Sequence, residues 1–474
     1  MKKKFYVTTA IDYVNAEPHI GHAYQKIVAD VIARWHKIKG ERVFFLTGTD
    51  EHGQKLARSA EKAGKTPKEF VDSIAPKFKK SWDLLNVQYD RFIRTTDEDH
   101  KKKVSEFVKL MEKKGDIYKG EYIGLYCEGC EAYVTEKDCV GGRCPYHPNK
   151  ELKEFKEKAY FFRLSKYEKK LLEFYEKNKE YILPIFRRKE IINRVKEGLK
   201  DLNITRLKEN MSWGIPFPLD NNYVIYVWYE ALLNYITGIG WPNDKKFKEF
   251  WPADVELLGI DNGWFHCVIW PAMLLSAGIK LPKTILINGF LTFNGKKISK
   301  SLGNVISPKS LVDKYGADSI RYYVCRNFVF GQDGDFSENQ LVSRYNGELA
   351  DKFGNLVSRV AGLIERNGVE KCENKLIKKL KVKEIDKKIE NYEFDKALNL
   401  IFEFIDVCNE YVQNKKPWET GDKKVLYELK ESILKIAELL WPFIPSSSEK
   451  VTKQFSTKNI KKGEILFKKI ELEK

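Results

Sequence analysis

The spacing of apolar and polar residues predicts an α/β domain at the start of the chain. Lys4–Thr9 and Arg42–Thr47 are short runs rich in β-branched and aromatic residues, which is typical of strands. Ile20–His36 lies between them and has apolar residues at helical spacing, so the three segments form a βαβ unit and predict a parallel sheet. A further helix is expected from Thr66, an N-cap candidate followed by proline, to about Leu85.

The α/β pattern continues, breaks and then returns. Tyr89–Ile93 is expected to be a strand and Glu98–Lys114 a helix, but from about Tyr118 to Asn222 cysteines, glycines and charged stretches replace the alternation. The later signals are strand Val255–Ile260, helix Phe265–Ala277 and strand Thr284–Leu291. We therefore expect an insertion that splits one α/β domain into two halves.

The last third of the chain is predicted to be helical. Strand signals nearly vanish after about Ser337, and heptad-like segments such as Lys396–Tyr411 and Leu426–Leu440 follow one another. A chain of 474 residues is expected to hold about three structural units. The predicted boundaries are residues 1–117 and 223–325 for the two halves of the α/β domain, 118–222 for the insertion, and 326–474 for a linker and the helical domain.

Charge and cysteine usage narrow the possible functions. Lys and Arg number 84 against 67 Asp and Glu, and the net charge of +17 favours a polyanionic partner such as nucleic acid. The alternative is that the lysines only solvate the surface and bind no such partner. Four of the eight cysteines fall between Cys127 and Cys144, which indicates a reducing compartment and one metal site rather than a disulfide framework. The chain has neither a signal-peptide pattern nor a long uncharged apolar run, so we expect a soluble cytoplasmic protein without a membrane segment.

Two closely spaced pairs of residues predict a zinc site. Cys127 and Cys130 form a C-x-x-C pair, and Cys144 and His147 form a C-x-x-H pair. Three thiolates and one imidazole complete a tetrahedral shell with no open position, so we expect a single structural zinc ion. Cys139 stands outside the two pairs and is interpreted as a bystander. The alternative is that Cys139 replaces Cys144 as a ligand.

A histidine pair follows the first predicted strand. His19, Gly21 and His22 stand at the opening of a helix, where unpaired N–H groups and the positive end of the helix dipole favour an anion. Gly21 lets a ligand approach the backbone, and the imidazoles can donate to phosphate oxygens. The alternative is a hydrogen-bonded surface pair.

A second candidate phosphate-binding segment is Lys297–Ser301, with the sequence KISKS. Its residues Lys297, Ser299 and Lys300 lie in a glycine-flanked loop, which suits a mobile cover that closes over a polyphosphate and stabilises developing charge. A solvated basic loop is the alternative.

Together, in this order and at this separation, the two motifs resemble the HIGH and KMSKS signatures of class I aminoacyl-tRNA synthetases. The resemblance is to the methionyl enzymes in particular and includes residues 10–15, 48–53, Tyr226–Trp228, Phe265–His266 and Trp270–Ala272. It implies a split Rossmann catalytic domain, a doubly wound parallel sheet with a zinc-knuckle insertion, followed by an α-helical bundle that binds the anticodon. It also implies that L-methionine reacts with ATP, which carries Mg²⁺, and that the methionyl-adenylate then charges the 3′ end of tRNA(Met).

The resemblance implies roles for individual residues. The residues expected to stabilise phosphate charge are His19, His22, Lys297 and Lys300. The expected ATP-binding positions are His19, Gly21, His22, Gly259, Asp261, Lys297, Ser299 and Lys300. The expected methionine-binding positions are Ile11, Tyr13, Asp50, Trp228, Ala231, Leu232, Tyr235, His266 and Trp270. A carboxylate suits the substrate ammonium, and aromatic edges suit a thioether. Ile260 and Asn262 depart from the family pattern, which has lysine and an apolar residue there.

Three residues of the helical domain are implied to read the CAU anticodon. Asn355 and Arg359 lie one helical turn apart, and Trp418 follows Pro417 in a later loop. Amide and guanidinium donors beside an indole suit splayed single-stranded bases. The alternative for Trp418 is that it packs between helices.

Three other assignments compete with this one. The insertion is too short for an editing domain, which argues against leucyl, isoleucyl and valyl enzymes, and a cysteinyl enzyme would be expected to bind its substrate thiol through zinc in the active site. A catalytically silent zinc-containing RNA-binding module would not need both intact motifs and Asp50.

The chain ends about where the anticodon domain of the family closes. We therefore expect no appended dimerisation domain, and we expect a monomer.

Overall fold

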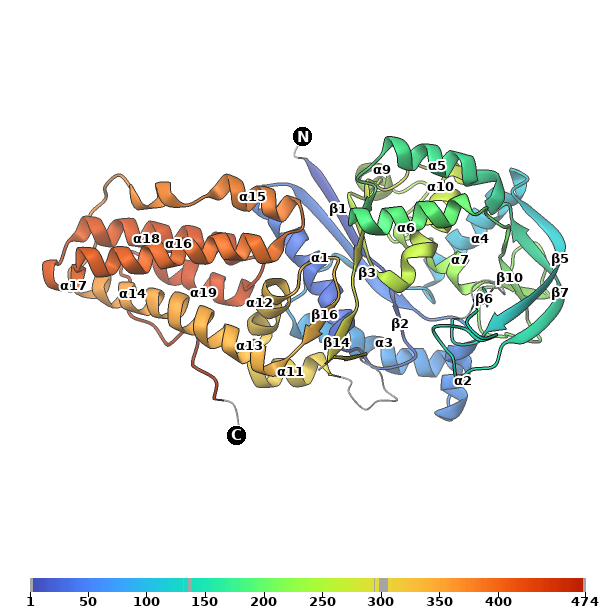
Figure 1. Ribbon diagram of the computed structural model, residues 1–474, viewed down its shortest axis with the longest axis horizontal. Coiled ribbons are helices and arrows are strands. Elements are labelled where there is room, and N and C mark those ends of the chain that lie inside the picture. Colours follow the sequence, from blue (N-terminus) through green and yellow to red (C-terminus); the bar gives the residue numbers. More distant parts are fainter. Residues whose placement is uncertain (1–2, 131, 135–138, 294, 298–305, 472–474) are drawn as a thin grey trace. The chain divides into compact units, whose positions relative to one another are not determined.

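The computed structural model describes residues 3–130, 132–134, 139–293, 295–297 and 306–471 (Figure 1). The chain divides into two compact units, each assembled from three segments. The first, here called the α/β unit, consists of Met1–Pro18, Arg42–Lys80 and Tyr89–Ile287; the second, here called the helical unit, consists of His19–Glu41, Ser81–Gln88 and Asn288–Lys474. No helix within the described ranges is long and apolar enough to cross a membrane.

A seven-stranded sheet forms the core of the α/β unit, in the order β2-β3-β1-β12-β13-β8, with β4 also paired to β3. Its strands are β1 (Lys4–Thr9), β2 (Asp12–Tyr13), β3 (Arg42–Asp50), β4 (Arg91–Arg94), β8 (Ile182–Leu183), β12 (Val255–Gly259) and β13 (Thr284–Asn288). Val7 lies opposite Phe45 on one side and Val255 on the other, in parallel register. Consecutive buried residues in β1 and β3 are typical of parallel strands covered on both faces.

The order of the strands creates a switch point at β1, because β3 lies on one side of it and β12 on the other. Ile11 follows β1, Asp50 ends β3 and Asp261 follows β12. Since parallel strands end at the same edge of a sheet, these three positions share the carboxyl edge. This is where open α/β sheets bind their ligands.

The predicted elements of the α/β unit are present, with shifts at their ends. The largest is in the predicted strand Thr284–Leu291, which ends at Asn288, so that Leu291 begins a separate strand of another sheet. Strand β1 has the predicted bounds, whereas β3 continues past Thr47 to Asp50. Helices α3 (Pro67–Leu84) and α4 (Glu98–Lys113) follow as expected. The predicted N-cap of α3 is present, since the Thr66 hydroxyl accepts from the backbone N–H of Glu69 at 3.3 Å. The Glu69 carboxylate accepts in return from the backbone N–H of Thr66 at 2.9 Å.

The predicted insertion contains a second sheet and also contributes to the first. Its antiparallel strands, in spatial order, are β6 (Ala132–Val134), β5 (Ile117–Cys127), β7 (Lys153–Phe162) and β9 (Leu202–Asn203). Helices α5 (Glu168–Lys177) and α6 (Ile185–Lys196) flank β8, which pairs in parallel with β13 of the central sheet. The sequence did not predict this contribution of β8, because a two-residue strand has no periodicity to detect.

Seven further short elements belong to the α/β unit. They are α2 (Gln54–Lys62), β10 (Thr205–Leu207), β11 (Tyr223–Ile225), α7 (Val227–Ala231), α8 (Asn234–Thr237), α9 (Lys245–Phe250) and α10 (Trp270–Ala277). The predicted helix over Phe265–Ala277 is present, but its first part, Phe265–Ile269, is π-helical.

The helical unit begins with α1 (Ile20–Ile38) and a small sheet of β14 (Leu291–Phe293), β15 (Lys296–Lys297) and β16 (Gly334–Phe336). Its other helices are α11 (Pro308–Tyr315), α12 (Ala317–Asn327), α13 (Glu338–Arg344), α14 (Asn355–Asn367), α15 (Val382–Glu390), α16 (Phe394–Lys415), α17 (Pro417–Thr420), α18 (Lys423–Leu440) and α19 (Pro445–Phe455). Helices α14, α16 and α18 contact one another and run lengthwise as a bundle (Figure 1). Beyond β16 the described elements are helical, which confirms the predicted fold class.

Candidate active site and metal centre

The histidine pair caps the first helix of the chain. His19 is the N-cap of α1, and its Nδ1 accepts from the backbone N–H of Gly21 at 3.1 Å. In return, Nδ1 of His22 accepts from the backbone N–H of His19 at 3.2 Å, so the two imidazoles form a reciprocal capping box. A Cβ at Gly21 would lie 2.9 Å from the His19 ring, so only glycine leaves room for this cap.

The cap decides which ring nitrogen of each histidine carries the proton. Because Nδ1 of each neutral imidazole accepts from the backbone, the proton of each ring is on Nε2. Burial, with a contribution from Lys26, lowers the pKa of His22 to about 3, so His22 is neutral at physiological pH. His22 can therefore donate a hydrogen bond to an anion from Nε2 but brings no positive charge of its own.

The aromatic residues predicted to bind the methionine side chain lie together. Trp228 stacks on Phe265 with ring centroids 3.8 Å apart, and the tilted rings of Tyr235 and Trp270 have centroids 5.8 Å apart. Tyr235 and Trp270 are fully buried, whereas Ile11 and Trp228 are partly exposed. These residues therefore form a mostly apolar cluster in which Ile11 and Trp228 are partly exposed.

A hydrogen-bond chain orients the histidine of this cluster. Nδ1 of His266 lies 2.9 Å from the Asn262 carbonyl, which can only accept, so Nδ1 carries the proton. Nε2 then accepts from the Tyr235 hydroxyl at 2.6 Å. Burial lowers the pKa of His266 to about 4, which keeps this imidazole neutral and the direction of the chain fixed. The departure at Asn262 leaves this chain intact, since its backbone oxygen makes the bond.

Asp50 is held at the carboxyl end of β3. It lies opposite Tyr13 of β2 in parallel register, its side chain is almost fully buried, and its carbonyl accepts from the N–H of Val14 at 3.2 Å. The short strand β2 was not predicted. Its pairing brings two predicted methionine-site residues next to each other.

One buried carboxyl group of this region was missed. Glu256 on β12 is fully buried, and its Oε1 accepts from Nε1 of Trp270 at 3.2 Å. Burial raises the pKa of Glu256 to about 8, so this group is largely protonated at neutral pH. The sequence offered one signal for this group, a single acidic residue inside a predicted apolar strand.

The nucleotide-binding candidates on β12 are adjacent in space. A Cβ at Gly259 would lie 2.8 Å from Oδ1 of Asp261, so glycine leaves room for the carboxylate in this position. Asp261 is exposed in a short 3₁₀ turn, Ile260–Asn262. Ile260, at the position where the resemblance implies lysine, packs against the core as an apolar residue.

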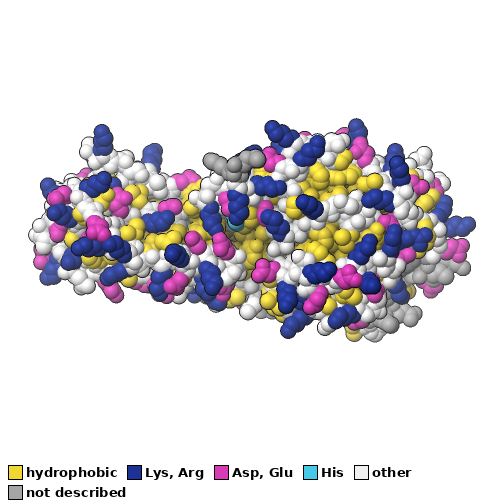
Figure 2. All heavy atoms as spheres, turned by 90° about the horizontal axis from the view of Figure 1, so that it is seen from above, with side chains coloured by type: hydrophobic (Ala, Val, Ile, Leu, Met, Phe, Trp, Pro, Cys, Tyr) yellow, Lys and Arg dark blue, Asp and Glu magenta, His cyan; other side chains and the backbone are white. Residues whose placement is uncertain are grey.

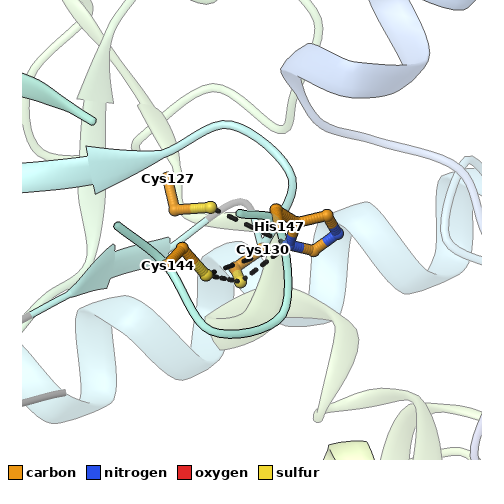
Figure 3. Close-up of side chains that lie close together, drawn as sticks. All are labelled: Cys127, Cys130, Cys144 and His147. Carbon is orange, nitrogen blue, oxygen red and sulfur yellow. Dashed lines mark hydrogen bonds between the residues drawn. The ribbon is translucent and has the colours of Figure 1, made fainter. Parts of the chain in front are cut away.

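The four predicted zinc ligands converge on one point (Figure 3). Nδ1 of His147 lies 3.3 Å from Sγ of Cys130, 3.8 Å from Sγ of Cys127 and 4.0 Å from Sγ of Cys144. Zn–S and Zn–N bonds of about 2.3 and 2.0 Å place tetrahedral ligands roughly 3.5–3.8 Å apart, so the donors fit zinc. All four donor atoms lie within 4.8 Å of one another, and Cys139 is not part of the cluster.

The turn between the first two ligands depends on glycine. A Cβ at Gly129 would lie 2.3 Å from the His147 ring, which leaves no room for any other residue. The structure also shows that Nδ1 is the ring nitrogen of His147 nearest the Cys130 thiol, which the sequence did not indicate.

The KISKS segment lies mostly outside the described residues. Lys297 ends β15, and Ser299 and Lys300 fall in the range that the structure does not describe. The hairpin before it is present, with Thr292 opposite Lys297 and Gly295 at a φ of 72° in the turn. Asp335 holds this turn by accepting from the N–H of Gly295 at 2.9 Å.

The three predicted anticodon residues line one cavity of about 730 Å³ in the helical unit. The other residues of its wall are Ser358, Gly362, Leu363, Glu365, Arg366 and Lys462. Trp418 is 42% exposed, so part of its indole is accessible from solvent. An exposed indole beside amide and guanidinium groups can stack on a base.

A second cavity, of about 350 Å³, lies in the α/β unit and was not predicted. Its lining residues are Gln54, Lys55, Arg58, Ser59, Lys62, Glu128 and Lys150. Four of them are cationic and one is a carboxylate, so the cavity favours an anion. The helical spacing of Lys55, Arg58 and Lys62 was the available signal.

Comparison with known proteins identifies the family. The family model described as tRNA synthetases class I (M) matches residues 5–154 and 147–361, and the model described as Anticodon-binding domain of tRNA ligase matches residues 378–471. The methionine--tRNA ligase of Thermotoga maritima is 46% identical over 475 residues, covering 96% of this chain and 75% of that protein. That of Caldanaerobacter subterraneus is 43% identical over 516 residues, covering 100% of this chain and 80% of that protein.

The fold leads to the same family. A solved structure of Mycobacterium tuberculosis methionyl-tRNA synthetase in complex with methionyl-adenylate has a TM-score of 0.90 and 37% sequence identity, covering 95% of this chain and 94% of that one. Sequence and fold agree along nearly the whole length. The chain therefore belongs to the methionyl family of class I tRNA synthetases.

Proposed function

We propose that this chain is a methionine–tRNA ligase, which activates L-methionine with ATP and transfers it to the 3′ end of tRNA(Met). The observation that carries the proposal is the match to methionine–tRNA ligases over nearly the full length of the chain, in sequence and in fold. The aromatic cluster around Tyr235 and the carboxylate of Asp50 supply the chemistry that a thioether amino acid needs.

The proposed mechanism needs no protein nucleophile. The methionine carboxylate attacks the α-phosphorus of ATP in line, and pyrophosphate leaves with the bonding electron pair. The Nε2–H groups of His19 and His22, with Lys297 and Lys300, stabilise phosphate charge. A terminal adenosine hydroxyl of tRNA then attacks the adenylate carbonyl and forms an ester, AMP leaves with the bonding electron pair, and the hydroxyl proton is released. Magnesium bound to ATP would neutralise part of the phosphate charge.

The zinc ion has a structural role in this proposal. Cys127, Cys130, Cys144 and His147 would complete the shell of a tetrahedral zinc ion, which would leave no position for a substrate. This donor set also argues against a cysteinyl enzyme that binds its substrate thiol through zinc.

The two cavities are proposed as contacts for tRNA. Lys and Arg side chains are spread among acidic ones on the face in Figure 2, so net charge alone does not locate the nucleic acid. The cavity around Trp418 suits unstacked anticodon bases, and the cations around Arg58 suit phosphates.

The domain assignment is also proposed. Residues 1–117 and 223–325 would form the catalytic domain, 118–222 the connective insertion apart from β8, and 326–474 the linker and anticodon-binding domain. The monomeric state and the cytoplasmic location stay predictions.

ATP–pyrophosphate exchange over all amino acids tests the proposal. Methionine should support the fastest exchange, and the enzyme should then charge tRNA(Met). Faster exchange with cysteine or leucine would assign the chain to another substrate. Absence of exchange with every amino acid would support a silent RNA-binding module instead.

Replacing Trp418 with Ala should separate the two halves of the reaction. Loss of a stacked base costs about 1–3 kcal/mol, so aminoacylation efficiency should fall roughly tenfold, while adenylate formation without tRNA stays nearly unchanged. Kinetics on tRNAs with CAU and altered anticodons measure the effect. Tyr427→Ala, in the same bundle but outside the cavity, is the control. If Trp418→Ala discriminates between anticodons as strongly as wild type, this residue does not read the anticodon.

A further inference from the structure

A buried carboxylate joins two histidines in the α/β unit. Oε1 of Glu230 lies 2.9 Å from Nδ1 of His52, and Oε2 lies 3.0 Å from Nε2 of His100. The side chains of Glu230 and His100 are fully buried, and that of His52 is 5% exposed. Burial alone would raise the pKa of Glu230, but attraction to His52 and hydrogen bonds from both histidines outweigh it and hold the pKa below its ordinary value. The carboxylate is therefore ionised and accepts an N–H from each ring.

The three residues come from segments that carry different parts of the methionine site. His52 follows Asp50 by two positions at the end of β3, and Glu230 lies on α7 between Trp228 and Ala231. His100, on α4, makes a second hydrogen bond, between its Nδ1 and the Thr237 hydroxyl at 2.7 Å. Thr237 is the last residue of α8, the helix that carries Tyr235. One carboxylate thus links the ammonium side of the site to its aromatic side.

The linked segments need such an anchor. Helix α7 has five residues and α8 has four, and helices this short are not stable through their own hydrogen bonds. The segment after β3 is fixed on its other side as well, because Nε1 of Trp213 donates to the Glu51 carbonyl at 2.6 Å. The relative position of Asp50 and Trp228 therefore depends on tertiary contacts. The hydrogen bonds of the Glu230 carboxylate are among these contacts, and they are both buried and charge-assisted.

We propose that His52, Glu230 and His100 form a clamp that sets the span between the ammonium-binding carboxylate and the thioether pocket, and so selects the length of the amino-acid side chain. The three are positioning residues, since none is assigned a contact with the substrate. The proposal rests on the proposed function, because it takes methionine as the ligand of this site.

Exchange kinetics with methionine, ethionine and S-methylcysteine test the clamp, since each analogue differs from methionine by one methylene. In His52→Leu and Glu230→Gln the KM for methionine should rise about tenfold or more with a smaller change in kcat, and discrimination against the two analogues should fall at least about threefold. His52→Asn keeps a donor near the Nδ1 position and should recover most of both losses.

Asp116→Asn is the matched control. Asp116 is a buried carboxylate of the same unit that accepts from the Ser276 hydroxyl at 2.6 Å, and its substitution should lower thermal stability without changing the methionine KM. If His52→Leu does not fold, Glu230→Gln decides by the same criteria. An unchanged KM and unchanged discrimination in a folded Glu230→Gln enzyme would overturn the clamp, while wild-type exchange with methionine would leave the proposed function intact. Failure of the wild type to use methionine would instead refute the function.

Discussion

Asp50→Asn should cause the largest loss of methionine activation. The substitution removes the proposed counter-charge of the substrate ammonium at a nearly buried position. Leaving a buried charge without its partner costs about 2–5 kcal/mol, which corresponds to a fall of roughly thirtyfold to several thousandfold in kcat/KM for methionine. Exchange kinetics with methionine varied at saturating ATP give this constant directly.

The KM for ATP serves as the internal reference, because Asp50 is assigned to the amino acid. Asp244→Asn makes the same chemical change at an N-cap of the same unit, where Oδ1 accepts from the N–H of Lys246 at 2.7 Å, and should leave the constant unchanged. A methionine kcat/KM within about twofold of wild type in Asp50→Asn would place the ammonium site elsewhere.

The second large effect is expected at the metal centre. Cys144→Ala removes one of four converging donors, so the purified protein should lose its zinc, and the sheet of β5, β6 and β7 should become more sensitive to proteolysis. Structural zinc binds with an apparent free energy of about 10–16 kcal/mol in small peptides, so its loss should exceed the effect of an ordinary surface substitution. Elemental analysis and limited proteolysis measure the two outcomes.

Cys139→Ala is the matched control, because Cys139 lies in the same segment but outside the cluster. It should retain about one zinc ion per chain. A zinc-free wild-type protein after gentle purification would contradict the assignment, and zinc loss in Cys139→Ala would mean that Cys139 exchanges with a ligand.

Sequence signals that depend on near neighbours predicted the structure well. The bounds of β1, the cap of α3 and the helical final third followed from periodicity and capping residues, because these patterns reflect bonds between residues a few positions apart. The four candidate metal ligands could also be identified from the sequence, since two short pairs contain all four donors. The resemblance to class I synthetases added the expected roles of distant residues such as Asp50.

Other features depend on contacts between residues far apart in the chain. The bond between His52 and Glu230 spans 178 positions, and β8 joins the central sheet by pairing with β13. Neither contact has a local pattern, because a two-residue strand and a lone buried glutamate look like parts of their flanking segments.

The sequence by itself therefore determined the order of the elements, the candidate metal ligands and the family, since these are written in local spacing and recurring motifs. Only the tertiary structure decided which ring nitrogens of His19 and His22 accept the cap bonds and which nitrogen of His147 lies nearest the Cys130 thiol. It also decided the protonated state of Glu256 and the hydrogen bonds around Glu230. The physical reason is that burial and hydrogen-bond geometry set proton positions, and both arise only when segments from across the chain pack together.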